Sequence, residues 1–233
     1  MKKFNSLVIV LLLSLAVTSC SKKDDNPAAP KDEPPGIPSV SFKGPNTNST
    51  DQWAIYTKSS VESMNAYPMM LSAFSSANPT SKDGQWRWEL SPVAGFTESF
   101  AGTRNSDGSY TWVLMLNGTY EGSTYSNWKA LEGTTSSDGK SGSWKAFEDN
   151  TNVLTADYTW STSSTGVLSG TFKGYENSVV TGKIEITNNP DNSGSLLVYN
   201  SGELMFKSTW IANGTGQWWG YENGVQKTQG NWQ

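Results

Sequence analysis

The chain has 233 residues, 17 basic and 21 acidic side chains, a formal net charge of -4 at pH 7, no histidine and one cysteine. The lack of histidine removes the commonest general base and metal ligand, and a single cysteine allows neither an internal disulfide nor a thiolate zinc site. The basic residues occur singly, so the sequence shows no basic patch for nucleic acid, and no nucleic-acid partner is expected.

The first 19 residues have the pattern of a secretory signal peptide. Two lysines precede an apolar run over residues 7–16, and small residues follow it. An apolar run this short is a signal peptide rather than a membrane span. It ends at Val-Thr-Ser-Cys, which resembles the lipobox of bacterial lipoproteins, whose cysteine is acylated with chains such as palmitate. The resemblance implies that Cys20 carries a lipid anchor in the outer membrane.

Residues 20–49 are predicted to be the lipidated cysteine followed by a disordered tether. This stretch contains many prolines and charges of both signs, and its apolar residues show no periodic pattern. It therefore cannot bury enough apolar surface to offset the entropy lost on ordering. Lys23, Asp24 and Asp25 are similar to the acidic export signal of surface-displayed lipoproteins of the Bacteroidota. That resemblance implies that the protein faces the outside of the cell.

An amphipathic helix is predicted from Asp51 to about Ala77. Apolar side chains recur there at steps of three and four residues, and Thr50 or Asp51 is the expected N-cap. Pro68 should kink the helix or divide it in two. The apolar stripe is expected to pack against the sheet that follows, and it consists of Trp53, Tyr56, Met64, Tyr67, Leu71 and Phe74.

From Gly84 onward the period changes to two, and turns such as Asn213-Gly214 are typical of antiparallel hairpins. Residues 50–233 are therefore predicted to be one mostly β domain, an up-and-down meander of about 12 strands with an N-terminal helical segment. Closure into a barrel around the helix is preferred because it removes exposed edges. A curved open sheet or a two-layer sandwich, with the helix on one face, is the alternative.

Glycine and an aromatic residue alternate on one face of several predicted strands, as in Gly142-x-Trp144 and Gly216-x-Trp218-x-Gly220. A glycine beside a large ring leaves room for that ring to lie across the neighbouring strand. This face is therefore expected to be the core. The tryptophans assigned to it are Trp144, Trp210, Trp218 and Trp232.

Residues 127–150, NWKALEGTTSSDGKSGSWKAFEDN, resemble the Trp- and Gly-rich domains of uncharacterised lipoproteins from the Bacteroidota. The resemblance extends loosely over residues 45–233. It supports the predicted localisation and the β architecture. It implies no functional residue.

Several aromatic residues are out of phase with the core rings and should point to the opposite face of the sheet. If that face is open, they form a platform on which a sugar ring or an apolar ligand stacks. If the helix or a second sheet covers the face, they are ordinary packing residues. These candidate ligand-binding residues are Phe147, Tyr175, Trp219 and Tyr221.

A pair of carboxylates is the catalytic chemistry that the composition leaves open. Glycoside hydrolysis needs an acid and a base or nucleophile about 5 to 9.5 Å apart. Most strand carboxylates occupy polar phases or strand ends, where we expect solvated side chains; they are Glu89, Glu98, Glu132, Glu148, Asp157, Glu176 and Glu185. The turns at 148–152 and 188–192 offer oxygen ligands for calcium, yet turn formation explains them equally, and no metal or cofactor is predicted.

The sequence thus predicts an outer-membrane-anchored, outward-facing lipoprotein that is a non-catalytic binding or scaffolding module. Its partners would be the membrane, through the lipid at Cys20, and a glycan, an apolar small molecule or another envelope protein. A carboxylate-dependent glycan hydrolase is the alternative. Two acidic side chains that converge in a concave, aromatic-lined site would favour the hydrolase.

Overall fold

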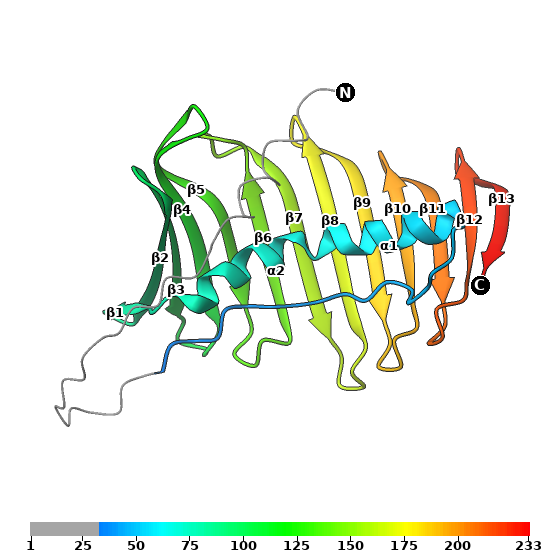
Figure 1. Cartoon of the computed structure of the whole chain (residues 1–233), viewed down its shortest axis with the longest axis horizontal. Coiled ribbons are helices and arrows are strands. Elements are labelled where there is room, and N and C mark those ends of the chain that lie inside the picture. Colours follow the sequence, from blue (N-terminus) through cyan, green and yellow to red (C-terminus); the bar gives the residue numbers. More distant parts are fainter. Residues whose placement is uncertain (1–32) are drawn as a thin grey trace.

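The structure, a computed structural model, describes residues 33–233, in which one antiparallel sheet of 13 strands curves around a helical segment (Figure 1). The predicted anchor and export residues, Cys20, Lys23, Asp24 and Asp25, lie outside the described residues. The strands follow one another in sequence order, as the predicted meander requires. They are β1 (Thr80–Lys82), β2 (Gln85–Val93), β3 (Phe96–Arg104), β4 (Tyr110–Tyr120), β5 (Ser123–Thr135), β6 (Ser141–Phe147), β7 (Leu154–Thr162), β8 (Leu168–Glu176), β9 (Val179–Asn188), β10 (Gly194–Asn200), β11 (Glu203–Trp210), β12 (Gly216–Glu222) and β13 (Val225–Trp232).

The sheet is open, and β1 and β13 are its two edges. No pairing joins these edges within residues 33–233, so the preferred prediction of a closed barrel was wrong and the curved open sheet is the arrangement found. The edges are protected in other ways. β1 has only three residues, and β13 exposes mainly polar side chains, including Lys227, which discourage pairing with another chain.

The helical segment crosses the concave face of the sheet from the β12 end to the β3 end (Figure 1). It consists of α1 (Gln52–Met64), α2 (Ala66–Leu71) and the 3-10 helix η1 (Ser72–Ser76). None of the helices in the described part of the chain has the length and apolar content needed to cross a bilayer.

Both ends of α1 follow the sequence prediction. The Asp51 carboxylate accepts hydrogen bonds from the backbone N–H groups of Trp53 and Ala54, at 2.8 and 3.1 Å, and is the N-cap. The helix breaks at Asn65, three residues before Pro68. The break follows from the proline ring, which would clash with the carbonyl four positions earlier in a continuous helix.

The last part of the predicted tether is docked on the sheet and needs correction. The chain over residues 37–49 runs beside the helical segment on the concave side (Figure 1), and Phe42 is only 2% exposed. The side-chain amide of Asn65 bonds both the N–H and the C=O of Phe42, and Asn188 does the same for Lys43, all four at 2.8 Å. The backbone of this segment is therefore held by side chains from the helical segment and from β9.

The inward face of the sheet is built from tryptophan rings that lie across glycines of a neighbouring strand. A Cβ placed on Gly133 would be 2.3 Å from the ring of Trp144, so only glycine fits there. This packing occurs at six directly paired positions in all, and the pattern expected from the sequence is confirmed. The pairs are Trp112 over Gly102, Trp144 over Gly133, Trp160 over Gly142, Trp210 over Gly194, Trp218 over Gly230 and Trp232 over Gly216.

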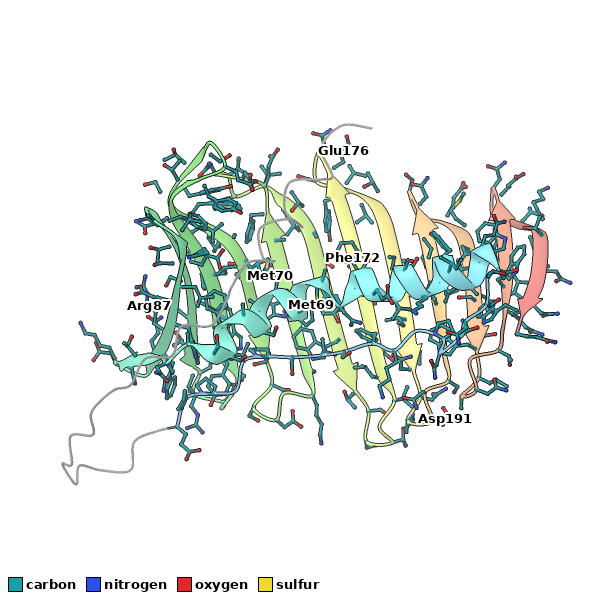
Figure 2. All side chains as sticks on the ribbon, viewed as in Figure 1. Met69, Met70, Arg87, Phe172, Glu176 and Asp191 are labelled. Atoms are coloured by element: carbon teal, nitrogen blue, oxygen red, sulfur yellow. The ribbon has the colours of Figure 1, made fainter. Side chains whose placement is uncertain are left out.

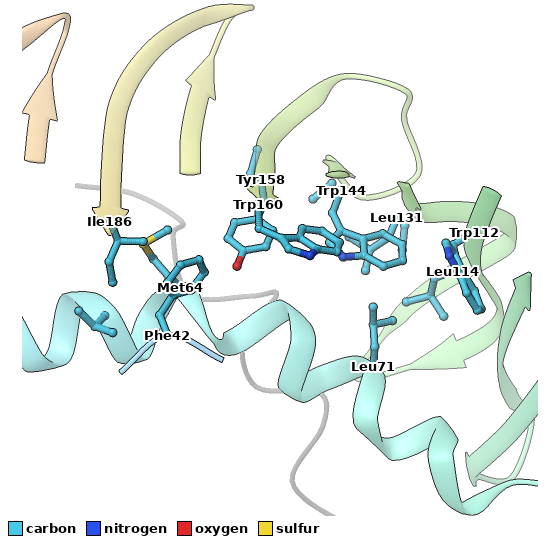
Figure 3. Packing of buried hydrophobic residues seen from close by; sticks show 14 of the residues in the cluster. Phe42, Met64, Leu71, Trp112, Leu114, Leu131, Trp144, Tyr158, Trp160 and Ile186 are labelled. Atoms are coloured by element: carbon cyan, nitrogen blue, oxygen red, sulfur yellow. The ribbon is translucent and has the colours of Figure 1, made fainter. Parts of the chain in front are cut away.

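The helical segment completes the core against these rings. Figure 3 shows Trp144 and Trp160 on the sheet side, with Leu71 of α2 facing them. Farther along, Trp53 of α1 stacks on Phe206 with ring centroids 5.3 Å apart. The predicted apolar stripe therefore packs on the sheet. Its most buried members are Met64, Leu71 and Phe74, all at most 1% exposed, whereas Tyr56 is 40% exposed.

Tight turns of the expected hairpin type join the strands. Asn223 and Gly224 both have positive φ, 51° and 71°, as a tight hairpin turn requires. Gly194 begins β10. Its role there is to make room for the ring of Trp210.

We predict that Gly133→Ala destabilises the fold by about 1 to 3 kcal/mol, because the new methyl group would meet the Trp144 ring and a backbone carbonyl. The matched control is Gly174→Ala. Gly174 is also an inward glycine inside a strand, but its Cβ would meet nothing within 4 Å. That change should be neutral or stabilise by about 0.4 to 1 kcal/mol. Urea unfolding of both variants measures the difference, and equal losses would contradict the packing role.

Candidate functional site

The outward face of the sheet carries the candidate site. The helical segment packs on the opposite, concave face, so it leaves this face uncovered. Arg87 of β2, labelled in Figure 2, projects from the outer side, whereas Met69 projects from the helical segment on the inner side. We call the central part of the outer face the convex belt. It consists of Lys129, Glu132, Lys145, Phe147, Asp157, Lys173, Tyr175, Lys183, Glu185, Tyr199, Lys207 and Trp219.

Strand register brings four charged residues of the belt and Tyr199 into one row. Lys145, Asp157, Lys173, Lys183 and Tyr199 are direct partners across β6 to β10. Neighbouring strands are about 4.8 Å apart, so residues distant in the sequence become adjacent. The row exists only because five strands keep the same register here.

The two adjacent tryptophans of β12 point to opposite faces, as the phase of the strand predicts. Trp218 faces inward, lies across Gly230 and packs on Trp53 with ring centroids 4.9 Å apart. Trp219 faces outward, is half-buried and has the Lys207 ammonium 4.9 Å from its ring centroid. Of the four candidate ligand-binding aromatics, Trp219 therefore lies where the prediction placed it.

Phe147 corrects the prediction of an open aromatic row. Its side chain is 7% exposed, and the ammonium of Lys129 lies 4.7 Å from its ring centroid. The same ammonium is 2.6 Å from the Glu132 carboxylate. Because only 7% of its side chain is exposed, the Phe147 ring is closed to stacking by a ligand. Tyr221 is half-buried on β12, beyond a bulge at Gly220, and is not part of the belt.

Tyr175 belongs to a cluster with Asp157 and Lys173. Its hydroxyl donates a hydrogen bond to Asp157 Oδ2, and the Lys173 ammonium lies 3.7 Å from the same oxygen. This hydrogen bond, followed by burial, raises the pKa of Tyr175 to about 12. Tyr175 is therefore a neutral hydrogen-bond donor at physiological pH.

A second cluster on β9 and β10 also combines a tyrosine, a carboxylate and a lysine. The Lys183 ammonium lies 3.8 Å from the ring centroid of Tyr199 and 2.9 Å from Glu185 Oε1. The Tyr199 hydroxyl donates to Glu185 Oε2 at 3.0 Å. Burial would raise the pKa of Glu185, but the hydrogen bonds from Lys183 and Tyr199 outweigh it and hold the pKa below its ordinary value. Glu185 is therefore ionised.

Sequence reasoning missed Tyr199 and the lysines of the belt. Tyr199 follows Leu196-Leu197-Val198, an apolar run without alternation, so its phase could not be read. The polar phase of Lys173 and Lys183 is visible in the sequence. Their alignment across strands depends on register, which single-strand patterns do not specify.

Rows of hydroxyl groups flank the belt on the same face. Thr134, Ser143, Thr159 and Thr171 are direct partners across β5 to β8, and the hydroxyls of Thr134 and Ser143 are 3.1 Å apart. A second row lies two residues farther along the strands. It consists of Ser141, Ser161, Ser169, Thr187, Ser195 and Thr209. Each hydroxyl can donate one hydrogen bond and accept two.

Glu98 corrects the expectation that the strand carboxylates are solvated. It is 3% exposed and shares the inward face with Phe96 and Phe100, a phase that FTESF already displays. Burial raises the pKa of Glu98 to about 7, and no neighbouring carboxylate contributes to the rise. Within residues 33–233 no cluster of three or more acidic or thiol side chains could hold a metal ion.

Comparison with known proteins gives no family for this chain. No family model matches it, and no curated protein matches its sequence.

We predict a pH-dependent stability caused by Glu98. Between its ordinary pKa of 4.5 and the raised value of about 7, the unfolded chain releases a proton that the folded chain retains. The free energy of unfolding should therefore fall by about 3 kcal/mol as the pH rises through this range, and level off above it. Urea melts from pH 4 to 8 measure the slope. In Glu98→Gln this part of the slope should vanish; an unchanged slope would show that Glu98 is not the group responsible.

Proposed function

We propose that the protein is a non-catalytic, outer-membrane-anchored lipoprotein that faces outward and binds a glycan on the convex belt. The lipobox-like sequence at Cys20 supports the anchor, and Lys23, Asp24 and Asp25 support surface display. The single observation that carries the binding role is the set of aromatic side chains that β8 to β12 direct to the uncovered face, beside rows of hydroxyls. These side chains are Tyr175, Tyr199 and Trp219.

A glycan fits this combination of groups better than an apolar ligand does. Tyrosine and tryptophan offer a large contact area at low entropic cost, and serine and threonine offer adaptable hydrogen bonds. A sugar ring presents both an apolar face and hydroxyl groups. An apolar ligand would instead remove water from the ion pairs of Lys173 and Lys183, and it could not replace the hydrogen bonds that this water makes with the charged groups.

A carboxylate-dependent glycan hydrolase is the second candidate, and Glu98 is the observation that favours it. A carboxyl with a pKa of about 7 remains partly protonated at neutral pH and can serve as a general acid. The mechanism also needs a second carboxylate about 5 to 9.5 Å away. Release of reducing ends from glycans by the wild type, abolished in Glu98→Gln, would replace the binding role with this one.

The tryptophan pair of β12 tests the binding role. Trp219→Ala should reduce the free energy of unfolding by less than about 1 kcal/mol, yet weaken glycan binding by about 1 to 3 kcal/mol, the scale of ring stacking on aromatics. The neighbouring Trp218→Ala is the matched control. It removes the ring packed on Trp53, which is partly buried against the core. The change should lower the free energy of unfolding by about 2 to 3 kcal/mol, less than the loss of a fully buried ring.

The measurement is a glycan array with the full chain, followed by titration calorimetry on the glycans retained and urea melts of both variants. Retention that is unaffected by Trp219→Ala would move the binding site away from the belt. An array without any retained glycan would refute the proposed function.

The anchor is tested by metabolic labelling with a palmitate analogue. Cys20→Ala should abolish incorporation and release the protein from the outer membrane, because the thiol is the acylated group. Asp24→Ala with Asp25→Ala is the companion variant. It should stay labelled but become protected from protease added to intact cells. Label that persists in Cys20→Ala would rule out the lipid anchor.

A further inference from the structure

The convex belt is a positively charged region on an acidic protein. Residues 33–233 carry 12 basic and 18 acidic side chains, a net charge of -6. Five lysines and three carboxylates face outward in the belt, a net charge of +2, so the rest of the described chain carries -8. Charge of one sign gathered on one face attracts a partner of the opposite sign.

Each carboxylate of the belt already has a partner within it. Glu132 is paired with Lys129 at 2.6 Å, and Glu185 with Lys183 at 2.9 Å. Asp157 Oδ2 accepts a hydrogen bond from the hydroxyl of Tyr175 and has the Lys173 ammonium nearby, whereas Asp157 Oδ1 is buried without a hydrogen-bond partner among the described residues. These groups therefore add little repulsion toward an incoming anion.

Two lysines of the belt remain without a carboxylate partner among the described residues, and they are Lys145 and Lys207. Lys145 is exposed and lies in the row between Glu132 and Asp157, but makes no ion pair with either. Lys207 rests over the ring of Trp219. One lies on β6 and the other on β11, about 24 Å apart at the usual strand spacing. A ligand that contacts both must be a polymer of several units.

The positions of the ammonium groups argue against stacking of neutral sugars alone. Lysines lie over the rings of Phe147, Tyr199 and Trp219, at 4.7, 3.8 and 4.9 Å from the centroids. A neutral sugar must displace a lysine from each ring that it covers. An anionic group can instead be bound by the ammonium, whose position the ring already restricts, so less entropy is lost on binding.

We infer that the glycan bound by the convex belt is an anionic polysaccharide, a chain that bears carboxylate or sulfate groups. The inference rests on the proposed function and adds the chemical class of its ligand. The ammonium groups of Lys145 and Lys207 bind the anionic groups. The flanking hydroxyl rows bind the sugar hydroxyls, and the ring of Trp219 positions the Lys207 ammonium.

A membrane surface is the competing anionic partner, and the distribution of apolar side chains disfavours it. A face that lies on a bilayer inserts large apolar side chains among the lipids. The large apolar side chains exposed in the described chain, such as Met69, Ile211 and Val225, lie on the helical segment, in turns or at strand ends and bulges. None belongs to the convex belt.

The test uses the full chain with Cys20→Ala, so that no lipid anchor contributes. Binding to dextran sulfate, polygalacturonate and unmodified dextran is measured by biolayer interferometry at increasing salt. We expect both anionic polymers to bind and to weaken with salt, because counterions are released on binding. Lys145→Gln with Lys207→Gln should weaken binding by about tenfold or more and lower the salt slope by about 1 per lysine.

The matched control is Lys58→Gln with Lys82→Gln, which makes the same change in net charge on α1 and on the edge strand β1, four strands away from β5. It should change the affinity by less than about twofold, since charges more than a Debye length away are screened. An equal loss in this control would overturn the inference. Dextran binding that depends on Trp219 but not on the two lysines would also overturn it, while the proposed function survives.

Two further outcomes separate a failure of the proposed function from a failure of this inference alone. If none of the three polymers binds and the glycan array is empty, the proposed function fails and this inference fails with it. If vesicles containing phosphatidylglycerol bind through Lys145 and Lys207 while the polymers do not, the belt is a membrane contact and the inference is overturned.

Discussion

The fold depends on tryptophan rings that lie across glycines of the neighbouring strand. Wherever Trp112, Trp144 or Trp160 covers a glycine, the inward face holds a large ring without forcing the strands apart. Glycine weakens a strand on its own, so the arrangement is favourable only because each ring is buried in exchange. Repetition across the sheet provides a continuous aromatic surface on which the helical segment docks.

The outward face of the sheet takes no part in the core. Because the inward face and the helical segment form the core, the outward face needs no cover, and its side chains can be polar. Hydroxyls, lysines and carboxylates occupy it in rows, since each strand contributes its outward residues at the same heights. The open sheet is accordingly a scaffold that presents one broad surface, with a three-residue strand at one edge and a polar strand at the other.

The interactions on this surface contribute little to stability. Exposed ion pairs such as that of Lys183 with Glu185 contribute about 0 to 1 kcal/mol each, and a lysine over an exposed ring about 0.5 to 1 kcal/mol. Their effect is to restrict the side chains, because Tyr175 and Tyr199 are each held by a carboxylate and a lysine holds Glu185. A surface whose groups are restricted in advance loses less entropy when it binds a partner.

The sequence by itself determined the local features of this protein. Period-two patterns, Asn-Gly turns, the Asp51 cap and the Pro68 break are set by neighbouring residues, and the opposite faces of Trp218 and Trp219 follow from strand alternation. Only the tertiary structure decided whether the sheet closes, where Phe42 docks, that Phe147 is covered, and which lysines stand side by side. Those features depend on register and curvature across many strands, which are fixed by contacts between residues far apart in the chain.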